Sequence, residues 1–90
     1  MKLKIKENML ITLKRKTWYY ETSDHNARRK DGYPAGGFLD KDEKLLVCEI
    51  KKAKTGTLKM KSLHRTKNTV YMFFDEKDAN YFFKTTNTCN

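Results

Sequence analysis

Three consecutive cations lie near the start of the segment NARRKDGYPAGG, which covers residues 26–37. Arg28 and Arg29 carry planar guanidinium groups whose donors match phosphate oxygens, and Lys30 adds a point charge. Tyr33 is close enough in sequence to stack on a ligand bound there. The glycines and the proline of this segment predict an exposed basic loop over residues 23–37. We expect this loop to meet a polyanion, although a mobile solvated loop would have the same composition.

A second basic segment follows, because no acidic residue occurs between Glu49 and Asp75. If part of it is a strand, Lys59 and Lys61 lie on one face while the apolar residues between them are buried. The charges would then form a ridge able to follow a nucleic-acid backbone. The candidate phosphate contacts in this segment are Lys51, Lys52, Lys54, Lys59, Lys61, Arg65 and Lys67.

The stretch GGFLDKDEKLLVCEIKKAKTG offers a different chemistry. It places Asp40 at the end of one expected strand and Glu49-Ile50-Lys51 on the next, which resembles the metal-binding hairpin of the PD-(D/E)xK nucleases. The resemblance implies that Asp40 and Glu49 hold Mg²⁺ and that Lys51 positions or activates the attacking water. It covers about a quarter of the chain, and Ala35-Gly36-Gly37 replaces the expected proline. The alternative is that Glu49 pairs with a neighbouring lysine across strands.

The formal net charge of +9 on 90 residues creates a surface potential that attracts polyanions, and nucleic acid is the commonest of these. The same lysines could instead keep a small sheet soluble and discourage edge pairing. Two cysteines provide neither a disulfide framework nor a zinc site, so we expect no metal and no cofactor. No apolar run is long enough to span a bilayer, and the first residues do not follow the pattern of a signal peptide. A cytoplasmic protein with no membrane partner is the expectation.

Alternation of apolar and polar residues with period two predicts a single small domain over residues 1–90, α+β but mainly β. We expect an antiparallel sheet of about four to six strands. Strands are predicted in KLKIK at 2–6, in MLITLKR, from Trp18 to about Thr22, on both sides of the turn at 54–56, and in TVYMFF at 69–74, which should be well buried. Leu46, Cys48 and Ile50 are expected to alternate with Val47, Glu49 and Lys51.

The segment DEKDANYFFKTT is open to two interpretations. Asp75 could cap a short C-terminal helix with Ala79, Phe82 and Phe83 on one side, or the chain could turn and return as a strand. The acidic residues at its start favour the helix. Residues 86–90 are expected to fray.

Aromatic residues are interleaved with the basic clusters, to which Lys14, Arg15 and Lys16 add a third. Basic grooves with exposed rings are what single-stranded nucleic acid requires. Trp18 and Tyr71 are nevertheless expected to pack in the core or on the sheet more often than to stack on bases.

These patterns favour a non-enzymatic module that binds nucleic acid, with RNA or another single strand favoured over duplex DNA because no recognition helix is apparent. In general style, the short basic chain, rich in lysine, asparagine and aromatic residues, looks like the small early proteins of large lytic bacteriophages. That resemblance implies a role in phage–host conflict in the host cytoplasm, such as an antitoxin that antagonises a host ribonuclease toxin or defence factor through bound RNA. The first alternative is a direct inhibitor of an acidic host protein, and the second is the Mg²⁺-dependent nuclease. A monomer or a small homo-oligomer would be compatible with the sequence.

Overall fold

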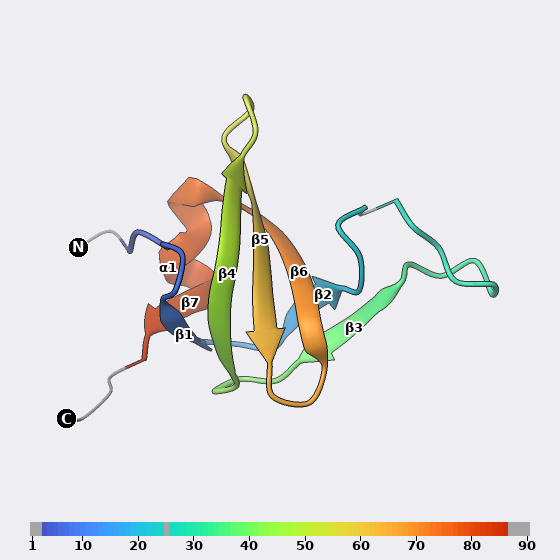
Figure 1. Ribbon diagram of the computed structural model, residues 1–90, viewed down its shortest axis with the longest axis horizontal. Helices are drawn as coiled ribbons and strands as arrows, with labels where there is room; N and C mark the ends of the chain where they lie inside the picture. Colours follow the sequence, from blue (N-terminus) through green and yellow to red (C-terminus); the bar gives the residue numbers. More distant parts are fainter. Residues whose placement is uncertain (1–2, 25, 87–90) are drawn as a thin grey trace.

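The computed structural model describes residues 3–24 and 26–86, whose arrangement is shown in Figure 1. Within these residues seven strands form one antiparallel sheet in the order β3-β2-β6-β5-β4-β1-β7. They are β1 (Leu10–Leu13), β2 (Thr17–Tyr20), β3 (Gly36–Leu39), β4 (Lys44–Lys52), β5 (Thr57–His64), β6 (Asn68–Asp75) and β7 (Phe83–Thr85). The count exceeds the expected four to six, because the very short β3 and β7 add the two edges.

A meander of the three longest strands, β4, β5 and β6, forms the middle of the sheet (Figure 1). Successive side chains of a strand point to opposite faces, and on β5 Leu58 and Met60 are buried while Lys59 is half-buried. Strand β6 follows the same rule, so only one face of the expected well-buried strand lies in the core. We call the face of the sheet that lines the core the inner face and the opposite one the outer face. The turn expected at 54–56 joins β4 to β5, with Gly56 at φ +93°.

Strand β4 departs from simple alternation at Cys48. The register with β5 shifts between Val47 and Glu49, so that Cys48 is an extra residue in a β-bulge. As a result Val47, opposite Ser62, and Ile50, opposite Met60, both contribute to the core. The expected alternation, which put Leu46 on the same face as Ile50, is therefore wrong, because a bulge moves every later residue to the other face.

The sheet curls into a half-barrel around a single core (Figure 1). Strand β1 pairs with β4 on one side and with β7 on the other, whereas β2, only three residues further along the chain, pairs with β6 and β3. Residues 14–16 therefore carry the chain across the open side of the half-barrel. The core is made by Ile5, Ile11, Leu13, Tyr19, Leu39, Leu45, Val47, Leu58, Met60, Val70, Met72, Phe74, Ala79 and Phe83.

Residues 36 and 37 belong to β3 and not to the loop that was expected to include them. Neither glycine has a positive φ, in contrast to Gly32 at +87°. Gly36 is required for another reason: a Cβ there would lie 2.1 Å from the carbonyl oxygen of Tyr19 and 2.8 Å from the ring of Trp18. The missing side chain lets the indole lie over the backbone of β3.

Both interpretations of the C-terminal segment are realised in part. After β6 a 3-10 turn, η1 (Glu76–Asp78), leads into the one-turn helix α1 (Ala79–Phe82), and β7 follows directly. The short C-terminal helix is thus confirmed, with Ala79 buried, although the side chain of Asp75 makes no capping hydrogen bond. The backbone N–H of Lys14 and the Nε of Arg15 donate to carbonyl oxygens of Phe82 and Tyr81, respectively.

Two terminal expectations are modified. Residues 3–6 form no strand, although Ile5 is buried in the core, and Lys2 lies outside the described residues. Of the tail expected at 86–90, Thr86 is held by its backbone N–H donating to Leu10 and by its hydroxyl contact with Thr12, and 87–90 lie outside the described residues. None of the helices in residues 3–24 and 26–86 has the length and apolar character needed to cross a membrane.

Ser62 generates a prediction about stability. Its side chain is fully buried, and its Oγ has no hydrogen-bond partner among the described residues. An unpaired buried hydroxyl costs free energy, so Ser62→Ala should raise the free energy of unfolding by about 1 kcal/mol, or the melting temperature by roughly 4–8 °C. Urea and thermal unfolding would measure this, with the exposed Ser23→Ala as the neutral control. A destabilised Ser62→Ala protein would mean that the hydroxyl has a partner.

Candidate functional site

Aromatic rings occupy one half of the outer face. They form a chain of edge-to-face contacts across β3, β2 and β6: Phe38 to Trp18 at 5.0 Å, Trp18 to Tyr20 at 6.0 Å, and Tyr20 to Phe73 at 5.3 Å between centroids. Tyr71 lies directly opposite Tyr20 in the register of β2 and β6. All of these rings retain solvent exposure, and none belongs to the core. The expectation for Trp18 and Tyr71 is therefore met in its sheet-face form, since both lie on the face away from the core.

Lysines occupy the other half of the outer face, on β5 and β4. Lys59 lies opposite Phe73 on one side and Lys51 on the other, so one row runs Lys51, Lys59, Phe73 across three strands. The next row places Lys61 between Glu49 and Tyr71. Cations and rings thus meet along the boundary between β5 and β6.

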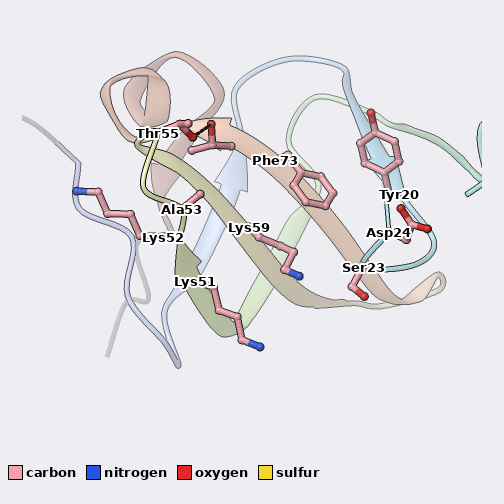
Figure 2. Close-up of a pocket in the computed structure, with 10 residues that line it drawn as sticks. Tyr20, Ser23, Asp24, Lys51, Lys52, Ala53, Thr55, Lys59 and Phe73 are labelled. Atoms are coloured by element: carbon pink, nitrogen blue, oxygen red, sulfur yellow. Dashed lines mark hydrogen bonds between the residues drawn. The ribbon is translucent and has the colours of Figure 1, made fainter. Parts of the chain in front are cut away.

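An open groove of about 830 Å³ lies over this boundary (Figure 2). In Figure 2, the side chains of Lys51 and Lys59 extend along one part of the groove, and Phe73 and Tyr20 lie beyond them. Ser23 and Asp24, from the start of the connection between β2 and β3, close the far end. The groove therefore combines positive charge, apolar ring surface and a polar end within one surface feature.

The described part of the basic loop, residues 21–24 and 26–35, projects away from the meander (Figure 1). Its tip is a tight turn in which Arg28 and Pro34 form an isolated bridge. The guanidinium of Arg29 donates to the carbonyl oxygens of Pro34 at 3.4 Å and Gly36 at 2.9 Å, so this side chain holds the loop in shape. Arg28 and Lys30 are exposed, and Tyr33 retains 68% of its surface.

Lys52 also lines the groove, where it pairs with Glu76 at 2.8 Å. The remaining predicted cations lie at separate places, and Lys54 is in the turn between β4 and β5. Arg65 and Lys67 lie in the turn between β5 and β6, at the other end of β5, which is roughly 25 Å long. Only Lys51, Lys59 and Lys61 of the predicted set share the outer face with the rings.

The residues of the nuclease resemblance are not on adjacent strands. Asp40 follows β3, which is separated from β4 in the order of the sheet by three strands, β2, β6 and β5. The hairpin implied by the resemblance is thus absent, because β3 pairs with β2 instead. Glu49 forms an ion pair with Lys51 at 3.1 Å, so the lysine partner is on the same strand and not across strands. Among residues 3–24 and 26–86, no three carboxylate, histidine or cysteine side chains are grouped to hold a metal ion.

A hydrogen bond between the buried His64 and the half-buried Glu43 links the turn before β4 to the turn after β5. The Nδ1 of His64 accepts hydrogen bonds from the backbone N–H groups of Thr66 and Lys67, so its Nε2 carries the proton and donates to Glu43 Oε1 at 2.6 Å. The other Glu43 oxygen accepts the backbone N–H of Asp40. That backbone hydrogen bond, followed by the contact with His64, lowers the pKa of Glu43 against the opposing effect of burial.

Sequence reasoning missed the polar end of the groove and the grouping of the rings. Phe73 was assigned to the core and neither Ser23 nor Asp24 was singled out. The available signal was the alternation itself, because placing Tyr19 and Met72 in the core puts Tyr20 and Phe73 on the outer face. No pattern in the sequence indicated that β2 would pair with β6.

The lowered pKa of Glu43 leads to a pH-dependent prediction. A carboxylate whose pKa falls on folding stabilises the protein above its unfolded pKa, near 4.5, and this contribution is lost as the pH falls through the folded value. Glu43→Gln should therefore lower the free energy of unfolding at neutral pH by about 1 kcal/mol, the size of a solvent-screened hydrogen bond to a charged group, and the difference from the parent should shrink as the pH falls below the unfolded pKa. Urea unfolding across a pH series measures this. A difference that is the same at every pH would contradict it.

No family model, curated protein or solved structure matches the chain in comparisons with known proteins. The groove between the lysines and the rings of the outer face is the feature whose chemistry points to a ligand.

Proposed function

We propose that the protein is a non-enzymatic module that binds single-stranded nucleic acid, RNA above all, across the outer face of β2, β6, β5 and β4. The observation that carries this proposal is the boundary at which Lys51 and Lys59 meet Phe73 and Tyr20. Cations there would contact phosphates while the rings stack on bases. Proteins that bind single strands without reading their base sequence use this combination.

A single strand fits this surface better than a duplex. The rings lie along the sheet and keep part of their surface in solvent, so an unstacked base could lie against them. Base pairs of a duplex are stacked on one another and would leave the rings without a partner. The one-turn α1 is also too short to read a major groove.

The basic loop extends the proposed surface in one direction. Arg28, Lys30 and Tyr33 are exposed at its tip and would contact a strand that leaves the groove. Arg29 has a positioning role in this proposal, because its guanidinium already binds backbone carbonyls. Lys54, Arg65 and Lys67 would contribute at a distance, through the general attraction of a positively charged body for RNA.

Removal of two groove lysines should weaken RNA binding in a salt-dependent way. In Lys51→Gln/Lys59→Gln, two phosphate contacts are lost, so the log–log slope of affinity against salt should fall by about 1.4 and the affinity by roughly tenfold at low salt. Fluorescence anisotropy with a labelled RNA measures both quantities. The control Lys77→Gln/Lys84→Gln removes the same charge from η1 and β7 and should leave the slope nearly unchanged. Equal effects of the two double variants would contradict a localised site.

Glu49 separates the proposal from the nuclease alternative. Its ion pair with Lys51 competes with phosphate, so Glu49→Gln should strengthen RNA binding by roughly twofold to fivefold, the range of a surface ion pair. The nuclease alternative requires instead that magnesium-dependent cleavage disappears in the same variant. Anisotropy and a denaturing gel of the same samples give both readouts. Weaker binding by Glu49→Gln would contradict the binding proposal.

A direct protein inhibitor is the second candidate, and one observation favours it. Leu46 and Leu63 lie opposite each other on the outer face and retain 40% and 46% of their surface, which is apolar area at one end of the basic face. An acidic host protein could contact both. Capture of a partner from lysate with and without ribonuclease treatment separates the two cases, because a partner held through RNA is lost on treatment.

A further inference from the structure

Charge is distributed unevenly around the groove. Lys51 and Lys59 line one side, Phe73 and Tyr20 lie beside them, and Asp24 lies next to Tyr20 (Figure 2). Ser23, beside Asp24, also borders a smaller hollow lined by Lys51, Lys59 and Lys61. A nucleotide has the same order of chemistry: an anionic phosphate, a flat base and a hydrogen-bonding base edge. A base that stacks on the rings would direct its phosphate to the lysines and its edge to Asp24.

The carboxylate of Asp24 is held in place and retains acceptor capacity. One oxygen accepts the backbone N–H of Asn26 at 2.9 Å, which fixes the side chain in an Asx turn. A carboxylate has about four lone-pair positions, and it accepts hydrogen bonds without donating any. The base edge at this position must therefore present donors.

We infer that the groove contains a base subsite that selects guanine, with Asp24 accepting from the guanine N1–H and N2–H₂ groups; this inference rests on the proposed binding of single strands. Guanine presents two adjacent donors on its Watson–Crick edge, and a carboxylate accepts both side by side. Adenine and cytosine each place an acceptor beside their donor, and uracil flanks its one donor with two acceptors, which the carboxylate repels. The Ser23 hydroxyl can donate to the guanine O6.

The test compares RNAs of about eight nucleotides that are uridine except for one central guanosine, adenosine, cytidine or uridine. The parent protein should bind the guanosine RNA about tenfold more tightly than the all-uridine RNA. Asp24→Asn keeps an acceptor for the turn with Asn26 but replaces half of the carboxylate by a donor. This variant should lose the preference while binding the all-uridine RNA as well as the parent or better.

Asp31→Asn is the matched control. Asp31 accepts the backbone N–H of Tyr33 in the same kind of turn, but on the basic loop away from the groove. It changes the net charge equally and should retain the guanine preference. Parent protein that binds all four RNAs equally, or a preference that survives Asp24→Asn, would overturn the guanine subsite and leave the proposed function intact. Failure to bind any of the four RNAs, even at low salt, would overturn both.

Discussion

Burial of only one face of the sheet is the constraint on which the rest of this structure depends. The hydrophobic effect requires each strand to bury one row of side chains, and in the described residues these rows form one core. The half-barrel places that core on the inner face, and α1 adds Ala79 to it, with Phe82 packed alongside. Among residues 3–24 and 26–86, no further helix or strand covers the outer face of the meander, so its rings remain partly exposed to solvent. The candidate site is a consequence of this burial of one face and exposure of the other.

The positive charges divide into two kinds that composition does not distinguish. Lys14, Arg15 and Arg29 satisfy carbonyl oxygens at α1 and in the basic loop, so they act on the fold. Lys59 and Lys61 alternate with buried residues of β5 and are held on the outer face by the same packing that buries Met60. A rigid strand therefore sets their positions, which costs less conformational entropy on binding than ordering a loop.

The sequence predicted the parts of the fold that depend on local pattern. The hairpin around Gly56, the strand at 69–74 and the helical turn around Ala79 follow from period-two alternation, turn chemistry and clustered acids, whereas the pairing of β6 with β5 was not predicted. The pairing of β2 with β6 could not be predicted, because it is decided by contacts between segments far apart in sequence. The bulge at Cys48 could not be predicted either, because no residue pattern marks the shift in the register of β4 with β5. The site divides in the same way: the lysines of β5 were found from their spacing and Phe73 lies beside them through the β5–β6 hairpin, whereas Asp24 follows β2 and depends on the pairing of β2 with β6. The expected placement of Asp40 and Glu49 on adjacent strands is wrong for the same reason, because nearness in sequence did not produce a hairpin.

The pairing of β1 with β7 has a consequence for how the chain reaches this structure. The hydroxyls of Thr12 and Thr86 meet across a sequence separation of 74 residues, whereas the strands of the meander are joined by short turns. Closing a long loop costs more chain entropy than closing a short one, so the meander is the part expected to form first. Phe73 and Tyr71 would thus lie beside the lysines as soon as the meander forms. The rings of β2 and β3 join them only when β2 docks on β6, and β7 pairs with β1 at the opposite edge.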